Sequence, residues 1–326
     1  MLSKFEPFEI TDVIYKEING KAFTTSILVP KSLKSASAPL LAHFHGGGLI
    51  VGDRMFEPWF PLWLLQFAES QGAIVVSPDY RLLPEATGLD ILEDVKDFWG
   101  WVKGSLPSQV SDISNGLSLD LNRIAVAGES AGELDCTTVS DSLGKAELTE
   151  VYTGGYLSLQ SALLYPEVCI KLVMAQYGTL DFAHPAYNPK PATTLSAEAS
   201  LTTKYIRSIK PGSIRLSSIP PQQWDLCLAI LSEGRHRELV GNDDKIYIVK
   251  NLENAKRIPA MWLVHGNEDT TLPSQTGVDF VKKVKELHPN ASIRFNVLPG
   301  GHGFDVMSTL EDDWVKEGVK FCSKYW

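Results

Sequence analysis

The sequence places a serine in a segment that is typical of a nucleophile. Ser130 is the central residue of the pattern GESAG at residues 128–132, directly after the apolar run 124–127. A G-x-S-x-G pattern after a strand turns the chain sharply into a helix and leaves the serine hydroxyl at the apex of the turn. The flanking glycines carry no Cβ, which lets strand and helix approach closely. Short runs of small residues also arise by chance in loops, so the remaining chain must supply a base and an acid.

Two further loops hold those groups. A serine hydroxyl needs a base within hydrogen-bond reach, and the base needs an acid that fixes its tautomer. His302 follows the apolar run 293–298 and is the candidate base, although a histidine in a glycine-rich loop is often structural. Asp269 follows the run 261–264 and is the candidate acid, with the adjacent Glu268 as its rival. The order serine, acid, histidine is one of the known serine-hydrolase orders.

Three glycines after another apolar run predict an oxyanion hole. Residues 45–48 read HGGG and follow a short buried strand at 40–44. Glycines let backbone amides converge on the point where a carbonyl oxygen becomes negative. We expect the amides of Gly46, Gly47 and Ala131 to bind that oxygen and His45 to orient the loop. The alternative is a flexible turn without a chemical role.

The elements that must position these residues alternate between strand and helix. Asn19-Gly20 predicts a hairpin between strands 13–18 and 23–29, and residues 32–39 form a polar loop. Further strands are expected at 40–44, 73–76, 172–177, 261–264 and 293–298, with helices at 58–69, 92–102, 278–287 and 314–325. This alternation predicts an α/β fold whose mostly parallel sheet is covered on both faces.

Charged residues in two segments have structural explanations. The segment DYRLLPE at 79–85 adjoins a core strand and is expected to form an ion-pair cluster. Helical spacing puts Glu93, Asp94, Lys96 and Asp97 mostly on the solvent face of the helix at 92–102.

Regular alternation is lost from Phe182 to about Arg257. This stretch contains six prolines and short apolar helical patterns. A long irregular insertion in a compact fold is usually a lid or binding element. We therefore expect residues 182–257 to form a cap inserted in a single domain that spans 1–326. A disordered linker is the alternative, but the apolar residues around Trp224 need burial.

Composition excludes several classes of protein. A net charge of −9 argues against nucleic acid as a partner. No apolar run approaches the roughly 20 residues of a membrane span, and the first residues lack a hydrophobic signal core. The four cysteines have no metal-ligand spacing and are expected to be reduced thiols. These features predict a cytoplasmic protein, and they leave its oligomeric state open.

With these motifs in order, the chain resembles the hormone-sensitive-lipase-like, or fold-3, branch of the α/β-hydrolases. The resemblance rests on HGGG at 45–48, DYRLxPE at 79–85, GESAG at 128–132, HGxxDxxLP at 265–273 and GHGF at 301–304. It covers roughly residue 40 to the end. The resemblance implies ester hydrolysis through an acyl-enzyme, with Ser130 attacking, His302 moving the proton and Asp269, rather than Glu268, orienting His302. It implies no metal or organic cofactor.

The sequence departs from that family in two places. The family often has an N-terminal cap of several dozen residues, whereas only about ten residues precede the first strand here. The family pattern also continues SAGG directly into an apolar helix. Here a fitting continuation begins only at Gly155, so residues 133–154 are 22 extra residues. This piece has the length of a short intron, and its ends are compatible with splice signals. We hypothesise a retained intron, with a genuine insertion as the alternative.

These observations favour a serine esterase that acts on small or medium acyl esters. A thioesterase, lactonase or acyltransferase of secondary metabolism could use the same residues. A catalytically impaired binding protein is the other alternative, because residues 133–154 interrupt the segment after the serine and could displace the Ala131 amide.

Overall fold

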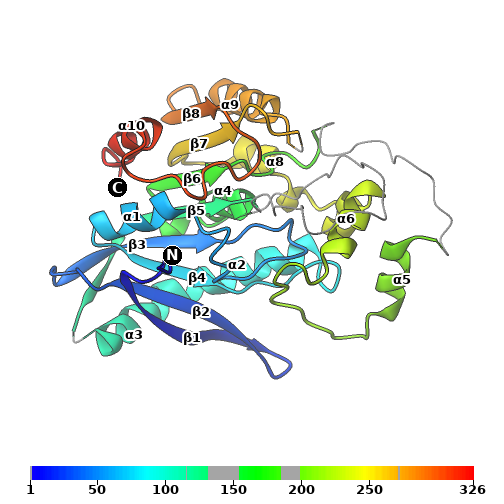
Figure 1. Cartoon of the computed structure of the whole chain (residues 1–326), viewed down its shortest axis with the longest axis horizontal. Coiled ribbons are helices and arrows are strands. Elements are labelled where there is room, and N and C mark those ends of the chain that lie inside the picture. Colours follow the sequence, from blue (N-terminus) through cyan, green and yellow to red (C-terminus); the bar gives the residue numbers. More distant parts are fainter. Residues whose placement is uncertain (1, 115, 131–153, 185–198, 271) are drawn as a thin grey trace.

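The computed structural model is built on one eight-stranded sheet, and it describes residues 2–114, 116–130, 154–184, 199–270 and 272–326 (Figure 1). The strands are β1 (Phe8–Ile18), β2 (Lys21–Pro30), β3 (Ser37–Phe44), β4 (Ile74–Pro78), β5 (Ser118–Glu129), β6 (Leu172–Gln176), β7 (Ala260–Gly266) and β8 (Ile293–Leu298). They lie in the order β1-β2-β4-β3-β5-β6-β7-β8. All neighbours from β4 to β8 are parallel, whereas β2 is antiparallel to both β1 and β4. The predicted α/β class is therefore confirmed.

The hairpin β1–β2 turns at the predicted residues. Asn19 has φ of 50° and Gly20 has φ of 75°. Two consecutive positive φ angles are those of a type I′ turn, whose twist matches the paired strands. Both strands are longer than predicted, because their outer ends pair with each other from Phe8–Pro30 to Ile18–Lys21. The polar loop expected at 32–39 is shorter, since β3 already begins at Ser37.

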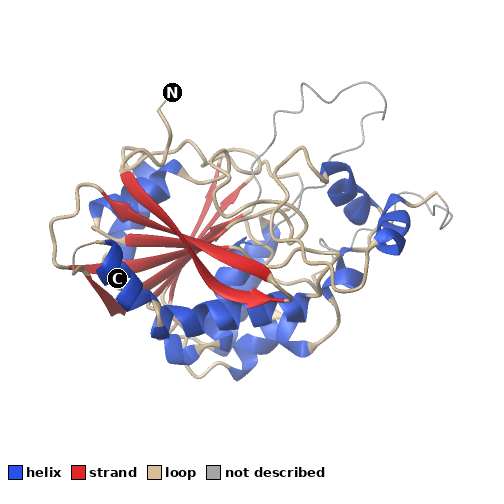
Figure 2. Ribbon diagram, turned by 90° about the horizontal axis from the view of Figure 1, so that it is seen from below, coloured by secondary structure: helices blue, strands red, loops and turns tan. Residues whose placement is uncertain are grey.

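Helices cover both faces of the sheet (Figure 2). They are α1 (Leu62–Ser70), α2 (Gly88–Gly104), α3 (Leu106–Ile113), α4 (Gly154–Leu164), α5 (Leu201–Ser208), α6 (Trp224–Ser232), α7 (His236–Val240), α8 (Ile248–Asn254), α9 (Gln275–Leu287) and α10 (Asp313–Cys322). Side chains of α1 and α10 pack in the core on one face. Those of α2, α3, α4, α8 and α9 pack on the other. The helix predicted from residue 58 begins four residues later, at Leu62.

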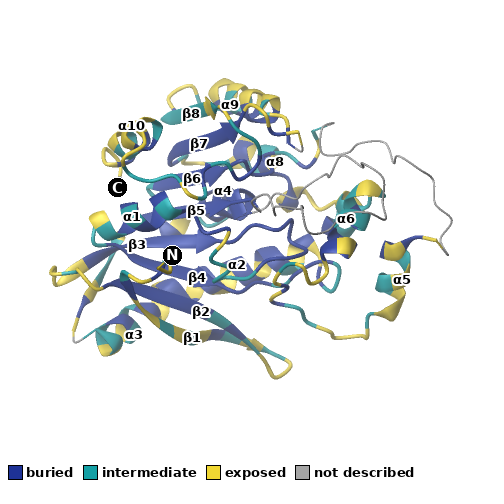
Figure 3. Ribbon diagram, in the orientation of Figure 1, coloured by how far each residue is buried: buried dark blue, intermediate teal, exposed yellow. Residues whose placement is uncertain are grey.

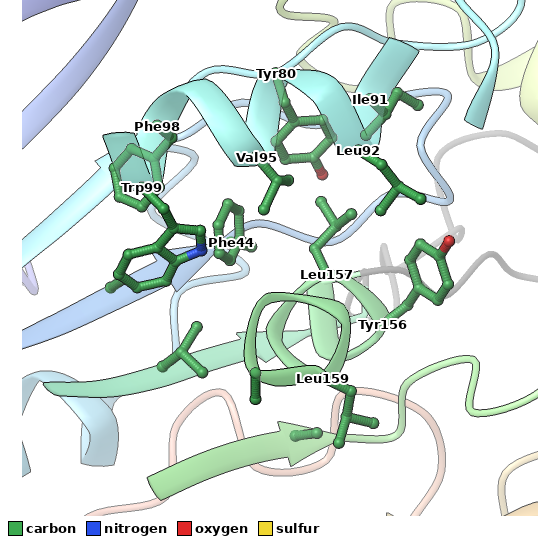
Figure 4. Packing of buried hydrophobic residues seen from close by; sticks show 14 of the residues in the cluster. Phe44, Tyr80, Ile91, Leu92, Val95, Phe98, Trp99, Tyr156, Leu157 and Leu159 are labelled. Atoms are coloured by element: carbon green, nitrogen blue, oxygen red, sulfur yellow. The ribbon is translucent and has the colours of Figure 1, made fainter. Parts of the chain in front are cut away.

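Helix α4 is enclosed between the sheet and α2. Its described residues from Gly154 to Leu163 are all buried. Leu157 points toward Leu92 and Val95 of α2 (Figure 4). A mostly apolar helix that is buried on all sides is stable only where neighbours cover every side. The covering elements therefore fix α4, and with it the start of this helix beside β5.

One prediction on α2 is wrong. Asp94 was expected in solvent with its charged neighbours, but its side chain is fully buried. It accepts from the Lys16 ammonium at 2.5 Å and from the Arg81 Nε at 2.9 Å. Lys16 lies on β1, so the spacing of residues along α2 could not show that Lys16 binds Asp94.

Figure 3 shows the exposed outer surface of the helices around the buried sheet.

The region between β6 and β7 contains the described helices α5 to α8. Helices α5 and α6 stand at one end of the sheet (Figures 1 and 2). Backbone bonds join this region to the loop after β3: the Gly52 amide donates to the Ser218 carbonyl at 2.8 Å, and the Ser218 amide donates back at 2.9 Å. The Arg215 Nε also donates to Glu85 at 2.9 Å. These contacts, with those of Arg81 and Asp94, confirm the ion-pair cluster expected at 79–85.

Candidate active site

The candidate nucleophile lies at the carboxyl end of a central strand. Ser130 directly follows β5 and is fully buried. On one side Gly128 of β5 is in register with Phe44 of β3, and on the other Glu129 is in register with Gln176 of β6. The next residue, Ala131, lies outside the described residues. Ser130 is thus flanked by the loops that follow β3 and β6.

Two pairs of glycines bring α4 against the strand ends. A Cβ on Gly128 would lie 2.3 Å from the Gly154 carbonyl oxygen, and one on Gly154 would lie 2.3 Å from the Glu129 oxygen. Gly155 similarly faces Gly178, at 3.1 Å from a built Cβ to the Gly178 Cα. No Cβ fits at Gly128 or Gly154 without a shift of the backbone, and one at Gly155 would be tightly packed. Gly154 therefore begins the helix beside the serine strand, one residue earlier than the sequence pattern indicated.

Asp269 and His302 are brought together by the two last strands. Asp269 follows β7 and His302 follows β8, and the His302 Nδ1 donates to Asp269 Oδ2 at 2.8 Å. Asp269 Oδ1 accepts from the Leu272 amide at 2.7 Å, and His265 Nε2 lies 3.2 Å from Oδ2. The rival acid Glu268 is exposed. Of the two candidate acids, only Asp269 is hydrogen-bonded to His302.

The electrostatics of this pair suit a neutral base and an ionised acid. Burial alone would raise the pKa of Asp269, but hydrogen bonds from His265 and His302 outweigh it and hold that pKa well below its usual range. Burial lowers the pKa of His302 from its ordinary value of 6.5, although Asp269 opposes this shift. At neutral pH the imidazole is therefore uncharged and able to accept a proton.

The first carbonyls of the HGGG loop are bound by donors around the loop. The Tyr80 hydroxyl donates to the His45 carbonyl at 2.7 Å, and the two rings stack with centroids 4.4 Å apart. His45 Nδ1 lies 2.7 Å from the Gly46 carbonyl oxygen. The Gly47 carbonyl accepts from the Val51 amide at 2.8 Å. These contacts support the prediction that His45 orients the loop.

The later part of this loop has an unusual backbone. Gly47, Gly48 and Leu49 have φ of 103°, 71° and 62°. A left-handed run is expected for glycine but is strained for leucine. The Gly48 carbonyl lies 2.9 Å from His236 Nε2, and the Leu49 carbonyl accepts from the Leu83 amide at 2.5 Å. Every carbonyl from His45 to Leu49 therefore has a donor, which fixes the peptide planes of the loop.

A buried carboxylate lies behind His302, and the sequence did not single it out. Asp305 accepts from the Tyr177 hydroxyl at 2.5 Å and from the Trp63 indole at 2.8 Å. The Tyr177 ring packs edge-on against the His302 ring, with centroids 4.5 Å apart. Burial raises the pKa of Asp305. Only its closeness to His302 in sequence could have drawn attention to Asp305, and Trp63 carries no such signal.

A second buried pair, His43 and Glu129, connects β3 with β5. Glu129, which precedes Ser130, lies 2.7 Å from His43 Nε2 on β3. His43 Nδ1 is 3.1 Å from the Ser77 hydroxyl, and the ring stacks on Phe60 at 3.8 Å. Both members of the pair are 1% exposed. This contact holds the carboxyl ends of β3 and β5 together.

The described part of the chain offers no site for a metal. Within it, no group of three or more His, Cys, Asp or Glu side chains is arranged to hold an ion. Among the described residues, Cys169, Cys227 and Cys322 are in no disulfide bond, and Cys136 lies outside those residues. None of the described helices is both long and apolar enough to cross a membrane.

Comparison with known proteins identifies the family of the chain. The model of the alpha/beta hydrolase fold family matches residues 41–208. The chain belongs to this family, in its fold-3 branch, and is a hydrolase of the carboxylesterase type. It is 33% identical to the probable carboxylesterase M8 of Phoma sp., over 99% of this chain and 98% of that protein.

Two further likenesses are more distant. The chain is 26% identical to part of the non-reducing polyketide synthase ascC of Acremonium egyptiacum, with 92% of this chain matched to 14% of that protein. Carboxyl esterase 2 of Tuber melanosporum has a similar fold, with a TM-score of 0.57 and 18% identity. That likeness covers 98% of this chain and 87% of the fungal esterase.

Proposed function

We propose that the protein is a serine hydrolase that cleaves carboxylic esters of small or medium acyl groups. The observation that carries the proposal is the bond between His302 and Asp269 at strand ends that adjoin Ser130 through β6. In this proposal Ser130 is the nucleophile, His302 the base and Asp269 the residue that fixes the tautomer of His302. Membership of the hydrolase family supports the same roles.

The reaction proceeds in two halves. His302 removes the Ser130 hydroxyl proton as the oxygen attacks the ester carbonyl, and Asp269 stabilises the resulting imidazolium. The protonated His302 then gives that proton to the departing alcohol, which leaves an acyl-serine. Water, deprotonated by the neutral His302, attacks this ester. The carboxylic acid is released and the proton returns to Ser130.

Backbone amides complete the proposed site. Gly46, Gly47 and Ala131 would donate to the oxyanion of each tetrahedral intermediate. Within the described part of the chain, the Gly46 and Gly47 amides have no acceptor, whereas the loop carbonyls are all bound. This arrangement supports the proposal that the Gly46 and Gly47 amides bind a substrate oxygen. No cofactor takes part in the proposed mechanism.

The cap and the insertion belong to the same proposal. We assign residues 182–257 to a cap inserted in a single domain, and residues 133–154 to an atypical insertion after the serine. The contacts of Ser218 and Arg215 with the loops after β3 and β4 support the cap. We further place the enzyme in the cytoplasm and expect a small-molecule ester, not nucleic acid, as its partner, in keeping with the net charge of −9.

Hydrolysis of p-nitrophenyl acetate and butyrate tests the proposal. We expect the full chain to hydrolyse both esters and Ser130→Ala to lose at least about 10³-fold in kcat, as expected when the nucleophile is removed. Ser108→Ala, at an exposed serine of α3, is the matched control and should keep full activity. A fluorophosphonate should label the Ser130 peptide only. Equal rates for the full chain and Ser130→Ala would refute the proposed nucleophile.

A thioesterase or acyl-transfer activity is the second candidate. The likeness of nearly the whole chain to one part of a polyketide synthase favours it, because such an enzyme carries its acyl chain as a thioester. An N-acetylcysteamine thioester with the same acyl group should be compared with the p-nitrophenyl ester. A higher kcat/KM for the thioester, or product formed with an added alcohol, would favour this second function.

A further inference from the structure

We propose that His236 is a positioning residue that holds the HGGG loop in the geometry needed for catalysis. It lies on α7, between β6 and β7, and its Nε2 is 2.9 Å from the Gly48 carbonyl oxygen. The two residues are 188 positions apart in the sequence. The inference rests on the proposed ester hydrolysis, because it assigns the loop amides to the oxyanion.

The chemistry of the contact settles the direction of the bond. Burial lowers the pKa of His236 below its ordinary value of 6.5, so the ring is neutral at pH 7. A carbonyl oxygen only accepts, which requires the proton of the neutral ring to lie on Nε2. The ring also packs near Phe182, with centroids 5.5 Å apart. His236 is thus held as a donor aimed at one peptide plane of the loop.

The loop needs such a donor because of its composition. Three successive glycines lose more conformational freedom on ordering than other residues, and they rotate readily when not held. The Gly48 carbonyl belongs to the peptide between Gly48 and Leu49, which is the second peptide after the one that carries the Gly47 amide; Gly47, with φ of 103°, and Gly48 lie between them. If the Gly48 carbonyl is not held, the backbone at Gly47 and Gly48 is free to rotate, and the Gly47 amide can then change direction. A fixed Gly48 carbonyl therefore keeps that amide directed at the oxyanion.

His236 differs from the other donors in its origin. The side chains and amides that bind the neighbouring carbonyls come from the loop itself or from the segment after β4, at Tyr80 and Leu83. His236 comes from the region that we assign to the cap. A second attachment, the paired backbone bonds of Gly52 and Ser218, joins the same two regions. The position of the cap therefore affects the geometry of the oxyanion loop.

Kinetics of His236 variants test this role. His236→Ala is expected to lower kcat about 10-fold with KM changed less than about twofold, since a loosened donor costs less than the 10²–10³ of a deleted one. His236→Gln places an amide donor near the Nε2 position and should recover most of kcat. Arg235→Ala is the control: it removes bonds to Glu238 and Thr203 without touching Gly48 and should leave kcat unchanged.

Hydrogen exchange of a peptide covering residues 45–50 supplies a measurement that needs no substrate. These amides should exchange faster in His236→Ala than in the full chain or in His236→Gln. Unchanged exchange together with unchanged kcat in His236→Ala would overturn the proposal, as would an equal loss of kcat in Arg235→Ala. If the full chain hydrolyses no ester, the proposed function fails, and the exchange rates still decide whether His236 holds the loop.

Discussion

Removal of residues 133–154 is the most informative perturbation of this chain. Deleting them leaves Ala131-Gly132 joined to Gly155, and deleting 132–153 instead gives the identical polypeptide, because Gly132 and Gly154 are the same residue type. In the structure, Gly154 already packs against Glu129, one residue before the serine. The strand end and the helix start are therefore in place for a direct connection.

The expected gain in stability follows from the length of the link. The chain between Ser130 and Gly154 shortens from 23 residues to one. Loop-closure entropy grows as about (3/2)RT ln n, so the shortening should stabilise the fold by about 3 kcal/mol. For a domain of this size, that corresponds to a rise in Tm of roughly 4–5 °C. We also expect the shortened chain to keep Ser130-dependent ester hydrolysis.

Thermal unfolding of three proteins measures this effect: the full chain, the shortened chain, and a chain in which residues 133–153 are replaced by a Gly/Ser linker of equal length. The linker variant should unfold close to the full chain, since its loop-closure entropy is the same. A shortened chain that unfolds at a lower temperature, or a linker variant far less stable than the full chain, would show that the segment makes stabilising contacts. Sequencing of the transcript separately tests the retained-intron hypothesis, which a dominant message encoding the segment in frame would exclude.

Three further predictions concern the glycines of α4 and α2, the base and its acid partner. Gly154→Ala should unfold or inactivate the protein, because its Cβ would lie 2.3 Å from the Glu129 oxygen. Gly100→Ala is the control: a Cβ there has nothing within 4 Å and should raise the free energy of unfolding by up to about 1 kcal/mol. Thermal unfolding of both variants measures the difference. The lowered pKa of His302 predicts that its neutral form, and hence kcat/KM, persists below pH 6.5 and is lost only as the pH falls through the folded-state pKa. A pH–rate profile whose acid limb has its midpoint above pH 6.5 would contradict this assignment. Asp269→Asn should lower kcat for ester hydrolysis by about 10⁴, because the amide no longer fixes the tautomer of His302.

The sequence by itself determined the class of fold and brought the candidate residues into view. Ser130 could be found because a glycine-flanked serine after an apolar run reflects local backbone geometry. The hairpin at Asn19-Gly20 was predictable for the same reason, since positive φ angles restrict the residue type. His302 and Asp269 could be named because each follows a strand whose apolar run is legible on its own.

Contacts between distant segments were decided only by the tertiary structure. Helical spacing placed Asp94 in solvent, whereas the Lys16 and Arg81 side chains bury it. The bond between Trp63 and Asp305 spans 242 positions, and that between His236 and Gly48 spans 188. The periodicity of a helix or strand shows which residues share one of its faces. It carries no information about which other element packs against that face. The family resemblance already favoured Asp269 over Glu268, but the bond of its carboxylate to His302 depends on the packing of β7 beside β8.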